Sequence, residues 1–375
     1  MTDQKPKVLY TSDIVIGLQY GDEGKGKIVH SLAKKSTNAY EYCVRFNGGA
    51  NAGHTIYHAG KKIVTHQVPS GILFGIPSII GDNCYVDVAK LLAEIEMLRS
   101  HDIKTDEGML YISPRCHIIT QEHLAEDGAD TAIGTTKSGI GPCATAKYGR
   151  HGTRIDICQN VELYKTLLDA GIDIQEPNRI FMEYFKKNNR HPRLLVEGAQ
   201  AYGLNITYGD YPYVTSSHCL ATDCLNMAGI NMHPTDCFGN TYTTRVWGVA
   251  KAYETYVGAK EFQPRDDPIL DKIQQVGQEF GSTTGRKRQC NYLSLDRLYE
   301  SGFVNQITHL VINKCDVLAH PDVNTFKFAD RDYNLTTLDE FMYIIRESVT
   351  GGMGRLPGLK KIYFEHYADS ATEFD

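Results

Sequence analysis

A glycine-rich segment with two lysines, GDEGKGK at positions 21–27, is the first part of the sequence whose residue types could do chemistry. It nearly satisfies the phosphate-loop pattern, in which glycines let the backbone approach a phosphate and a lysine adds positive charge. That pattern places Ser or Thr next as an Mg²⁺ ligand, but this sequence has Ile28. Asp22 is the nearest hard oxygen ligand, which is the kind that Mg²⁺ requires. The segment predicts a site for a phosphorylated ligand.

A second pattern, Asn-Lys-Cys-Asp at positions 313–316, follows the apolar run 309–312. It fits the NKxD pattern of guanine-nucleotide proteins, in which a carboxylate accepts hydrogen bonds from two donors of guanine, N1–H and the 2-amino group. Adenine offers no such pair of donors. Four residues are a weak signal alone, but with a phosphate loop they point to GTP.

Two further glycine-rich segments carry hydroxyl and basic groups. GTTKSGIGP at 134–142 offers hydroxyls and backbone amides for a second phosphate, and basic residues follow it at Lys147, Arg150 and Arg154. GSTTGRKR at 281–288 is suited to bidentate capture of a carboxylate or phosphate. These segments indicate a second anionic substrate beside the triphosphate.

Two more segments supply candidate groups for catalysis and base recognition. NGGANAGHT at 47–55 contains His54, and a histidine in a glycine-rich loop has few core neighbours and can act near neutral pH as an acid or charge stabiliser. EGAQ at 197–200 ends an apolar run with Gln200, whose amide could read a base edge.

The elements that position these loops follow from apolar runs and helical periodicity. The runs 14–17, 44–46, 194–196 and 309–312 read as strands that end in the loops, and helical spacing recurs at 88–98, 161–168, 179–187 and 338–345. Strands alternating with helices predict an α/β fold with a large, mainly parallel central sheet, flanking helices and ligands at the carboxyl ends of the strands. We expect a single domain over 1–375, with small helical elaborations at about 88–130 and 155–190 and a frayed tail at about 368–375.

Composition excludes several classes of protein. The 375 residues carry a net charge of −6, which gives no bulk attraction to nucleic acid. No apolar run approaches the roughly 18 residues of a membrane span, and the N-terminal stretch has no signal-peptide core. The ten cysteines include no CxxC pair, so we expect buried, reduced thiols and a cytoplasmic protein (in the host cytoplasm if the source is viral).

Taken together and in order, the motifs resemble the adenylosuccinate synthetase family, and most closely its short, archaeal-like branch. The resemblance runs from about Val15 to Val317 through GDEGKGK, NAGHT, PSGIL, GTTxxGIGP, EGAQ, YPYVTSS, KAYxTxVG and TTGRxR. It implies a homodimeric, Mg²⁺-dependent ligase in which GTP phosphorylates O6 of IMP and the amino group of L-aspartate then displaces that phosphate.

The resemblance also implies roles for individual residues. Asp22, His54 and Gln200 are the expected catalytic residues, with Asp22 as the base for the N1 proton, His54 as a stabiliser of phosphate charge, and Asp22 and the Gly53 carbonyl as metal ligands. The expected triphosphate site is Gly21, Glu23, Gly24, Lys25, Gly26, Lys27, Gly53, His54, Thr55, Arg288, Lys314 and Asp316. The expected purine monophosphate site is Asp22, Asn51, Thr135, Thr136, Arg150 from the partner subunit, Gln200 and Thr215. The expected aspartate site is Gly281, Ser282, Thr283, Thr284, Arg286 and Arg288.

Departures from the family pattern leave alternatives open. The C-terminal stretch 361–370 lacks the serine-threonine-glycine-proline type lid, so ATP is an alternative donor. Asn205 and Thr207 stand where many members are acidic, and Ala201 is followed by a bulky Tyr202 near the expected purine site. The phage enzymes of the same branch make 2-aminoadenylosuccinate from dGMP, so dGMP is the alternative acceptor. A regulatory GTPase is a remote alternative that leaves TTGRxR, EGAQ and GTTxxGIGP unexplained.

Overall fold

The computed structural model describes residues 8–35, 40–106, 108–129, 133–157, 160–227, 241–281, 285–351 and 354–365. Within them the strands are β1 (Val8–Gly17), β2 (Tyr42–Gly49), β3 (His54–His58), β4 (Lys61–Thr65), β5 (Ser78–Val86), β6 (Leu110–Ile112), β7 (His117–Ile118), β8 (Asp173–Ile174), β9 (Leu194–Glu197), β10 (Thr241–Lys251), β11 (Tyr253–Tyr256), β12 (Gln289–Tyr292), β13 (His309–Asn313) and β14 (Lys361–Phe364). The α-helices are α1 (Lys25–Lys35), α2 (Val88–Ser100), α3 (Gln121–Ala129), α4 (Ile140–Tyr148), α5 (Val161–Asp169), α6 (Pro177–Asn188), α7 (Ala221–Met227), α8 (Pro268–Val276), α9 (Leu295–Val304), α10 (Cys315–Leu318) and α11 (Leu338–Thr350), with 3₁₀ turns η1 (Ser70–Phe74) and η2 (Tyr202–Leu204).

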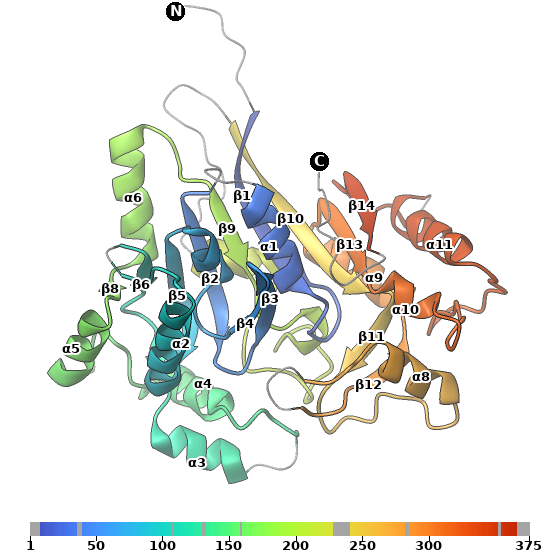
Figure 1. Cartoon of the computed structure of the whole chain (residues 1–375), viewed down its shortest axis with the longest axis horizontal. Coiled ribbons are helices and arrows are strands. Elements are labelled where there is room, and N and C mark those ends of the chain that lie inside the picture. The colour runs from blue at the N-terminus through green and yellow to red at the C-terminus, as the bar shows by residue number, and fades with distance from the viewer. Residues whose placement is uncertain are drawn as a thin grey trace, which may run out of the picture.

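A ten-stranded sheet forms the centre of the molecule. Its order is β14-β13-β10-β1-β9-β2-β5-β6-β8, with β7 also paired to β5. Every pairing found in it is parallel. Two small antiparallel hairpins, β3-β4 and β11-β12, lie outside it. In Figure 1, α1 crosses in front of the central strands, and α6 and α11 lie at opposite ends of the sheet. The expected α/β fold with a large parallel sheet is confirmed.

Alternation along β1 shows why both faces of the sheet are covered. Ile14 and Ile16 point into a core shared with α6, α8, α9 and α11, whereas Val15 points into a second core with Ile28 and Val29 of α1. Side chains on a strand alternate between faces, so an apolar run such as this one is stable only between two layers. Burial on both sides therefore fixes the register of the strand that leads into the phosphate loop.

The expected helices are present, but the two segments expected to be helical additions also contain strands. Helix α11 begins with a capping box made by Thr337 and Glu340, and α2 is capped by Asp87. The segments 88–130 and 155–190, expected to be helical additions, also contribute β6 and β8 to one end of the sheet. They are therefore continuous with the sheet and share its third core, which contains Leu91, Ile95 and Ile112.

Two other expectations concern cysteines and membranes. The eight cysteines within the described residues are all free and buried, as expected, whereas Cys158 and Cys237 lie outside those residues. The tail at 368–375 lies outside them too. Among the helices that the structure describes, none is long and apolar enough to cross a membrane.

Candidate active site

The predicted functional loops meet at one edge of the sheet. Strands β13, β10, β1, β9 and β2 are neighbours in the sheet and run parallel, so their carboxyl ends lie side by side. The loops that follow them carry the segments 18–24, 50–53, 198–217 and 314–316. The carboxyl edge of a parallel sheet is where ligands bind in open α/β folds. The geometry therefore collects the separate sequence motifs into one candidate site.

The phosphate loop is held in shape by Glu23. Its buried carboxylate accepts hydrogen bonds from the Gly21 backbone N–H and from Lys25 Nζ, both at 2.7 Å. Asn313 at the end of β13 donates from Nδ2 to the Glu23 carbonyl at 2.6 Å. A Cβ at Gly24, where φ is +91°, would lie only 2.8 Å from that Nδ2, so the glycine permits this approach. The side chain of Glu23 thus faces inward and shapes the loop.

Asp22 contacts the aspartate-site arginine directly. Its carboxylate Oδ2 lies 2.8 Å from Nε of Arg288, and the Asp22 side chain is 38% exposed. Arg288 in turn donates from NH1 to Glu279 Oε2 at 2.6 Å. The predicted base and the segment 281–288, which are far apart in the sequence, are therefore adjacent, with Arg288 between two carboxylates.

Glu279 is the centre of a buried ionic network below this pair. Its Oε1 accepts from Tyr253 OH at 2.7 Å and lies 3.1 Å from Lys251 Nζ. Burial by itself would raise the pKa of Glu279, but the positive charges of Lys251 and Arg288 outweigh burial and lower it to about 2. An ionised Glu279 therefore fixes Arg288 from behind.

His54 does not lie in an open loop as the sequence suggested. It begins β3 and is 7% exposed, with its Cβ 3.3 Å from the position a Cβ would take on Gly26 of α1. Its Nδ1 makes a short hydrogen bond with Glu197 Oε1, and Nε2 makes none within the described residues. The glycines around His54 indicated a loop, but pairing with β4 and the contact with Glu197 place the ring against the phosphate-loop helix.

Glu197 and Arg45 form a charged cluster around this histidine. Arg45 NH1 lies 3.0 Å from Glu197 Oε1, and the Ser70 backbone N–H donates to Oε2 at 2.8 Å. Burial would raise the pKa of Glu197, but contact with His54 and the Arg45 charge lower it to about 2. Burial lowers the pKa of His54, and the neighbouring Glu197 charge only partly opposes this effect.

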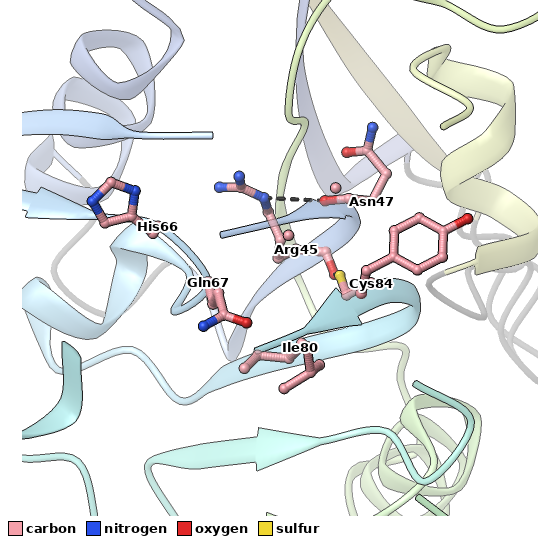
Figure 2. A pocket seen from close by; sticks show the side chains of 10 residues that line it. Arg45, Asn47, His66, Gln67, Ile80 and Cys84 are labelled. Atoms are coloured by element: carbon pink, nitrogen blue, oxygen red, sulfur yellow. Dashed lines mark hydrogen bonds between the residues drawn. The ribbon is translucent and has the colours of Figure 1, made fainter. Parts of the chain in front are cut away.

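The other side of Arg45 faces a narrow crevice (Figure 2), where its Nε donates to the Asn47 carbonyl at 3.3 Å. The crevice is too narrow for a water molecule and is lined by Arg45, Asn47, Gly48, Gly49, His66, Gln67, Ile80, Cys84, Tyr85 and Val86. The NH2 atom of Arg45 is buried and donates no hydrogen bond within the described residues. The crevice itself has no room for a ligand.

Two amides predicted to hold the purine monophosphate have unpaired buried oxygens. Asn51 Oδ1 and Gln200 Oε1 make no hydrogen bond within the described part of the chain. Gln200 has a φ of +55°, a left-handed conformation that is strained for a residue other than glycine. Asn47 holds the backbone around it, donating to Ala199 O at 3.1 Å and to His218 O at 2.8 Å. An unpaired buried amide oxygen costs about 1–3 kcal/mol, which a bound ligand with a donor would recover.

Other residues that the sequence predicts to bind the purine monophosphate or L-aspartate lie on neighbouring loops. Arg286 NH1 donates to the carbonyls of Gly134 at 3.1 Å and Thr135 at 3.3 Å, which brings the predicted aspartate loop to the second phosphate loop. The backbone N–H of Thr215 donates to the Leu204 carbonyl at 2.8 Å. Arg150 lies just beyond α4, exposed and with a φ of +64°. Ser282, Thr283 and Thr284 lie outside the described residues.

The NKxD turn also presents an unpaired group. Lys314 has a φ of +64°, and its Nζ donates to the carbonyl of Gly277, the residue that caps the C-terminal end of α8, at 3.0 Å. Asp316 Oδ1 is buried and has no hydrogen-bond partner among the described residues. A carboxylate oxygen left in this state is suited to accept from a base donor.

Sequence reasoning missed a polar network that joins two of the loops. Tyr20 OH donates to Asp210 Oδ2 at 2.6 Å, and Arg297 NH1 donates to Oδ1 of the same carboxylate at 3.2 Å. Lys260 Nζ makes a short contact with Asp210 as well. Asp210 therefore ties the start of the phosphate loop to the 198–217 segment. None of these residues belongs to a glycine-rich motif, so only their place in the fold reveals them.

The adenylosuccinate synthetase family model matches residues 14–189 and 178–331. This chain belongs to that family. Adenylosuccinate synthetases are ligases that form a C–N bond, so the expected enzyme class is confirmed. The bacterial adenylosuccinate synthetase of Acetivibrio thermocellus is 37% identical over 344 residues, covering 81% of this chain and 78% of the relative. That of Phocaeicola vulgatus is 36% identical over 389 residues, covering 93% and 88%.

Two solved structures share the fold. The fully ligated adenylosuccinate synthetase from Plasmodium falciparum superposes with a TM-score of 0.69 at 31% identity, covering 82% of this chain and 77% of that one. The cyanophage S-2L succinoaminodeoxyadenylate synthetase, bound to dGMP and dATP as an energy donor, gives a TM-score of 0.71 at 18% identity, covering 96% and 93%. At that identity the second likeness shows the fold alone.

Tyr202, the bulky residue near the expected purine site of this chain, is buried. Its side chain is 1% exposed, its OH donates to Glu300 Oε1 of α9 at 3.0 Å, and its ring contacts Tyr208. Asn205 is also committed locally, because Oδ1 accepts from the backbone N–H groups of Thr207 and Tyr208. Tyr202 and Asn205, two of the departures from the family pattern, therefore make packing and backbone contacts within and around the 198–217 segment.

Proposed function

We propose that this chain joins L-aspartate to C6 of IMP, with GTP as the energy donor, to give adenylosuccinate. The observation that carries the proposal is that three side chains matched to the family's nucleotide sites, Asn51, Gln200 and Asp316, keep buried oxygens unpaired at one edge of the sheet. Membership of the family supplies the reaction class. We also infer a cytoplasmic location and no part for nucleic acid or membrane as a partner.

The first step makes a leaving group. Asp22 takes the N1 proton of IMP, which moves electron density to O6, and O6 attacks the γ-phosphorus of GTP as the bond to the GDP oxygen breaks. Lys25 and Lys27 in the first turn of α1 and His54 beside Gly26 supply donors for the charge on the transferring group. Asp22 must first exchange its Arg288 contact for the substrate, so the pair describes the ligand-free state.

The second step forms the C–N bond. The amino group of aspartate attacks C6, the C6–O bond breaks, phosphate leaves, and the amine loses a proton. Arg286 and Arg288, with the segment 281–284, are the proposed holders of the aspartate carboxylates. Glu279 positions Arg288 for this contact because it binds the other edge of the guanidinium.

The oxygen groups at this edge fit a magnesium ion carried by substrate phosphate. Within the described residues no group of three His, Cys, Asp or Glu side chains could hold a metal by itself. Mg²⁺ commonly binds one or two carboxylates together with substrate phosphates and water. The Asp22 carboxylate and the Gly53 carbonyl would provide the protein ligands, and the ion would neutralise charge on the phosphates.

The proposal includes a homodimer in which Arg150 contacts the monophosphate bound to the other subunit. Arg150 is exposed at the end of α4, and no acidic side chain among the described residues pairs with it. An exposed arginine held in a left-handed backbone conformation is consistent with reaching a partner's ligand.

A side-by-side incubation tests the acceptor and the donor. The protein is given L-aspartate, Mg²⁺ and either GTP or ATP, with IMP in one set of tubes and dGMP in the other, and mass spectrometry follows the nucleotide–aspartate adduct. We expect an adduct from IMP with GTP. An adduct from dGMP but not from IMP would contradict the proposal and assign the phage-type activity. GTP turnover without aspartate or a purine monophosphate would indicate a GTPase instead.

A further inference from the structure

Glu365 links the two ends of the expected GTP site. It follows β14 and is 4% exposed. Its backbone N–H donates to Ile312 O at 2.8 Å, and its carbonyl accepts from the Cys315 N–H at 3.1 Å. Its carboxylate Oε2 lies 2.9 Å from Nζ of Lys27 in the first turn of α1. The backbone therefore rests on the NKxD turn while the side chain reaches the phosphate-loop helix.

The sugar of a bound GTP must lie between these two places. If Asp316 reads the base and the 21–27 loop holds the phosphates, the ribose that joins them spans the gap. Two contacts make that gap short: Asn313 Nδ2 donates to Glu23 O at 2.6 Å, and Gly24 approaches the same amide. Glu365 bridges the same two elements, which puts its carboxylate beside the sugar.

One oxygen of this carboxylate is available for the sugar. Oε2 contacts Lys27, and Oε1 accepts no hydrogen bond within the described residues. Carboxylates at the carboxyl edge of parallel sheets are well suited to accept from ribose hydroxyls, as in dinucleotide-binding folds. The sequence also lacks the family's lid motif at 361–370, and the family-model match ends at residue 331.

We propose that Glu365 determines donor specificity by accepting a hydrogen bond from the ribose 2′-hydroxyl, and so favours a ribonucleoside triphosphate over its 2′-deoxy form. The inference rests on the proposed function, since it takes the GTP position from Asp316 and the phosphate loop. The alternative is that Glu365 only pairs with Lys27, and this alternative predicts no difference in affinity between the two sugars.

Titration calorimetry with GTP and dGTP, in Mg²⁺ and without IMP or aspartate, tests the proposal. A hydrogen bond to a charged group is worth about 10- to 100-fold in affinity, so the wild-type protein should bind dGTP weaker by that factor. Glu365→Ala should bring the two dissociation constants to within about twofold, because neither sugar then finds a charged acceptor. Glu365→Gln, which keeps the shape and a neutral acceptor, should give an intermediate ratio.

Lys27→Met is the matched control because it breaks the same ion pair from the other side and leaves the carboxylate in place. It should weaken GTP and dGTP equally and keep their ratio. Equal wild-type affinity for both nucleotides, an unchanged ratio in both Glu365 variants, or a ratio lost in Lys27→Met to the same extent would overturn the inference. Wild-type protein that binds no GTP would overturn the proposed function itself, which separates the two failures.

Discussion

At the scale of single residues, the candidate site is marked by backbone conformations that are costly for side chains other than glycine. Asp22, Lys137, Arg150, Gln200 and Lys314 all have φ between +55° and +65°. Such conformations cost about 1–3 kcal/mol each and persist where the surrounding structure imposes them. Four of them lie in the sequence motifs, and Arg150 lies beyond α4, which begins within one of those motifs. The loops around these residues therefore impose the conformation, as other turns do at Ala59, Asp102, Asn189, Gln278, Gln306 and Asn324.

The role of Asp22 gives the sharpest prediction at this scale. Asp22→Asn removes the proton acceptor but keeps the size of the side chain, so IMP and GTP should still bind while kcat falls by about 10²- to 10⁴-fold. Steady-state kinetics and calorimetric binding of IMP measure the two effects separately. Asp339→Asn, an exposed change in the first turn of α11, is the control and should leave kcat unaltered. Near-normal turnover in Asp22→Asn would exclude this residue as the base.

At the scale of elements, the site depends on buried charges that connect neighbouring segments. Glu279 follows α8 and connects Lys251 at the end of β10, Tyr253 of β11 and Arg288 of the 281–288 segment. Removing one member of such a network leaves the others buried without a partner, which is strongly destabilising. The network therefore serves both the position of Arg288 and the stability of this part of the fold.

The lowered pKa of Glu279 makes its contribution to stability depend on pH. Its pKa is about 2 in the folded protein against 4.5 in the unfolded chain, so the unfolded state binds the proton first as pH falls. The stabilisation is complete above about pH 5 and is lost towards pH 2, with a full value of about 3 kcal/mol. In urea unfolding, Glu279→Gln should be destabilised near pH 7 and approach the wild type at low pH.

An exposed ion pair provides the control for that pH series. Glu261, whose side chain is 65% exposed, pairs with Arg265, and Glu261→Gln should change stability little at any pH. A Glu279→Gln curve that stays parallel to the wild type across the acid range would show that the carboxylate gives no pH-linked stability.

How far the sequence predicts these elements differs between the fold and the site. Apolar runs predict strands such as β1 and β9 because burial between two layers demands them. Glycine motifs predict the loops, because close backbone approach demands glycine. Neither signal identifies Glu279, Glu365 or Arg45, since single charged residues follow no period and acquire partners only when distant segments pack. His54 shows the same limit: its glycine-rich surroundings hide a strand and a buried carboxylate.

At the scale of the whole molecule, the assignment of Arg150 to the partner's site predicts how two inactive variants behave when mixed. Asp22→Asn and Arg150→Leu should each be nearly inactive alone, because every site in either homodimer lacks one group. In a mixed dimer one site lacks both groups and the other has both. Random exchange of subunits in an equal mixture makes half of the dimers mixed, so activity should return to about a quarter of the wild type.

The same mixture separates action between subunits from action within one. If Arg150 served the site of its own chain, each site of a mixed dimer would still lack one group, and mixing would restore nothing. Subunits are exchanged by brief treatment with mild denaturant followed by dilution, and mass photometry checks that dimers re-form. Dimers that re-form without recovered activity would assign Arg150 to its own subunit, whereas monomers throughout would remove the partner from the mechanism. The exposed position of Arg150 beyond α4, away from the buried pairs that hold Arg288 and Arg45, favours recovery.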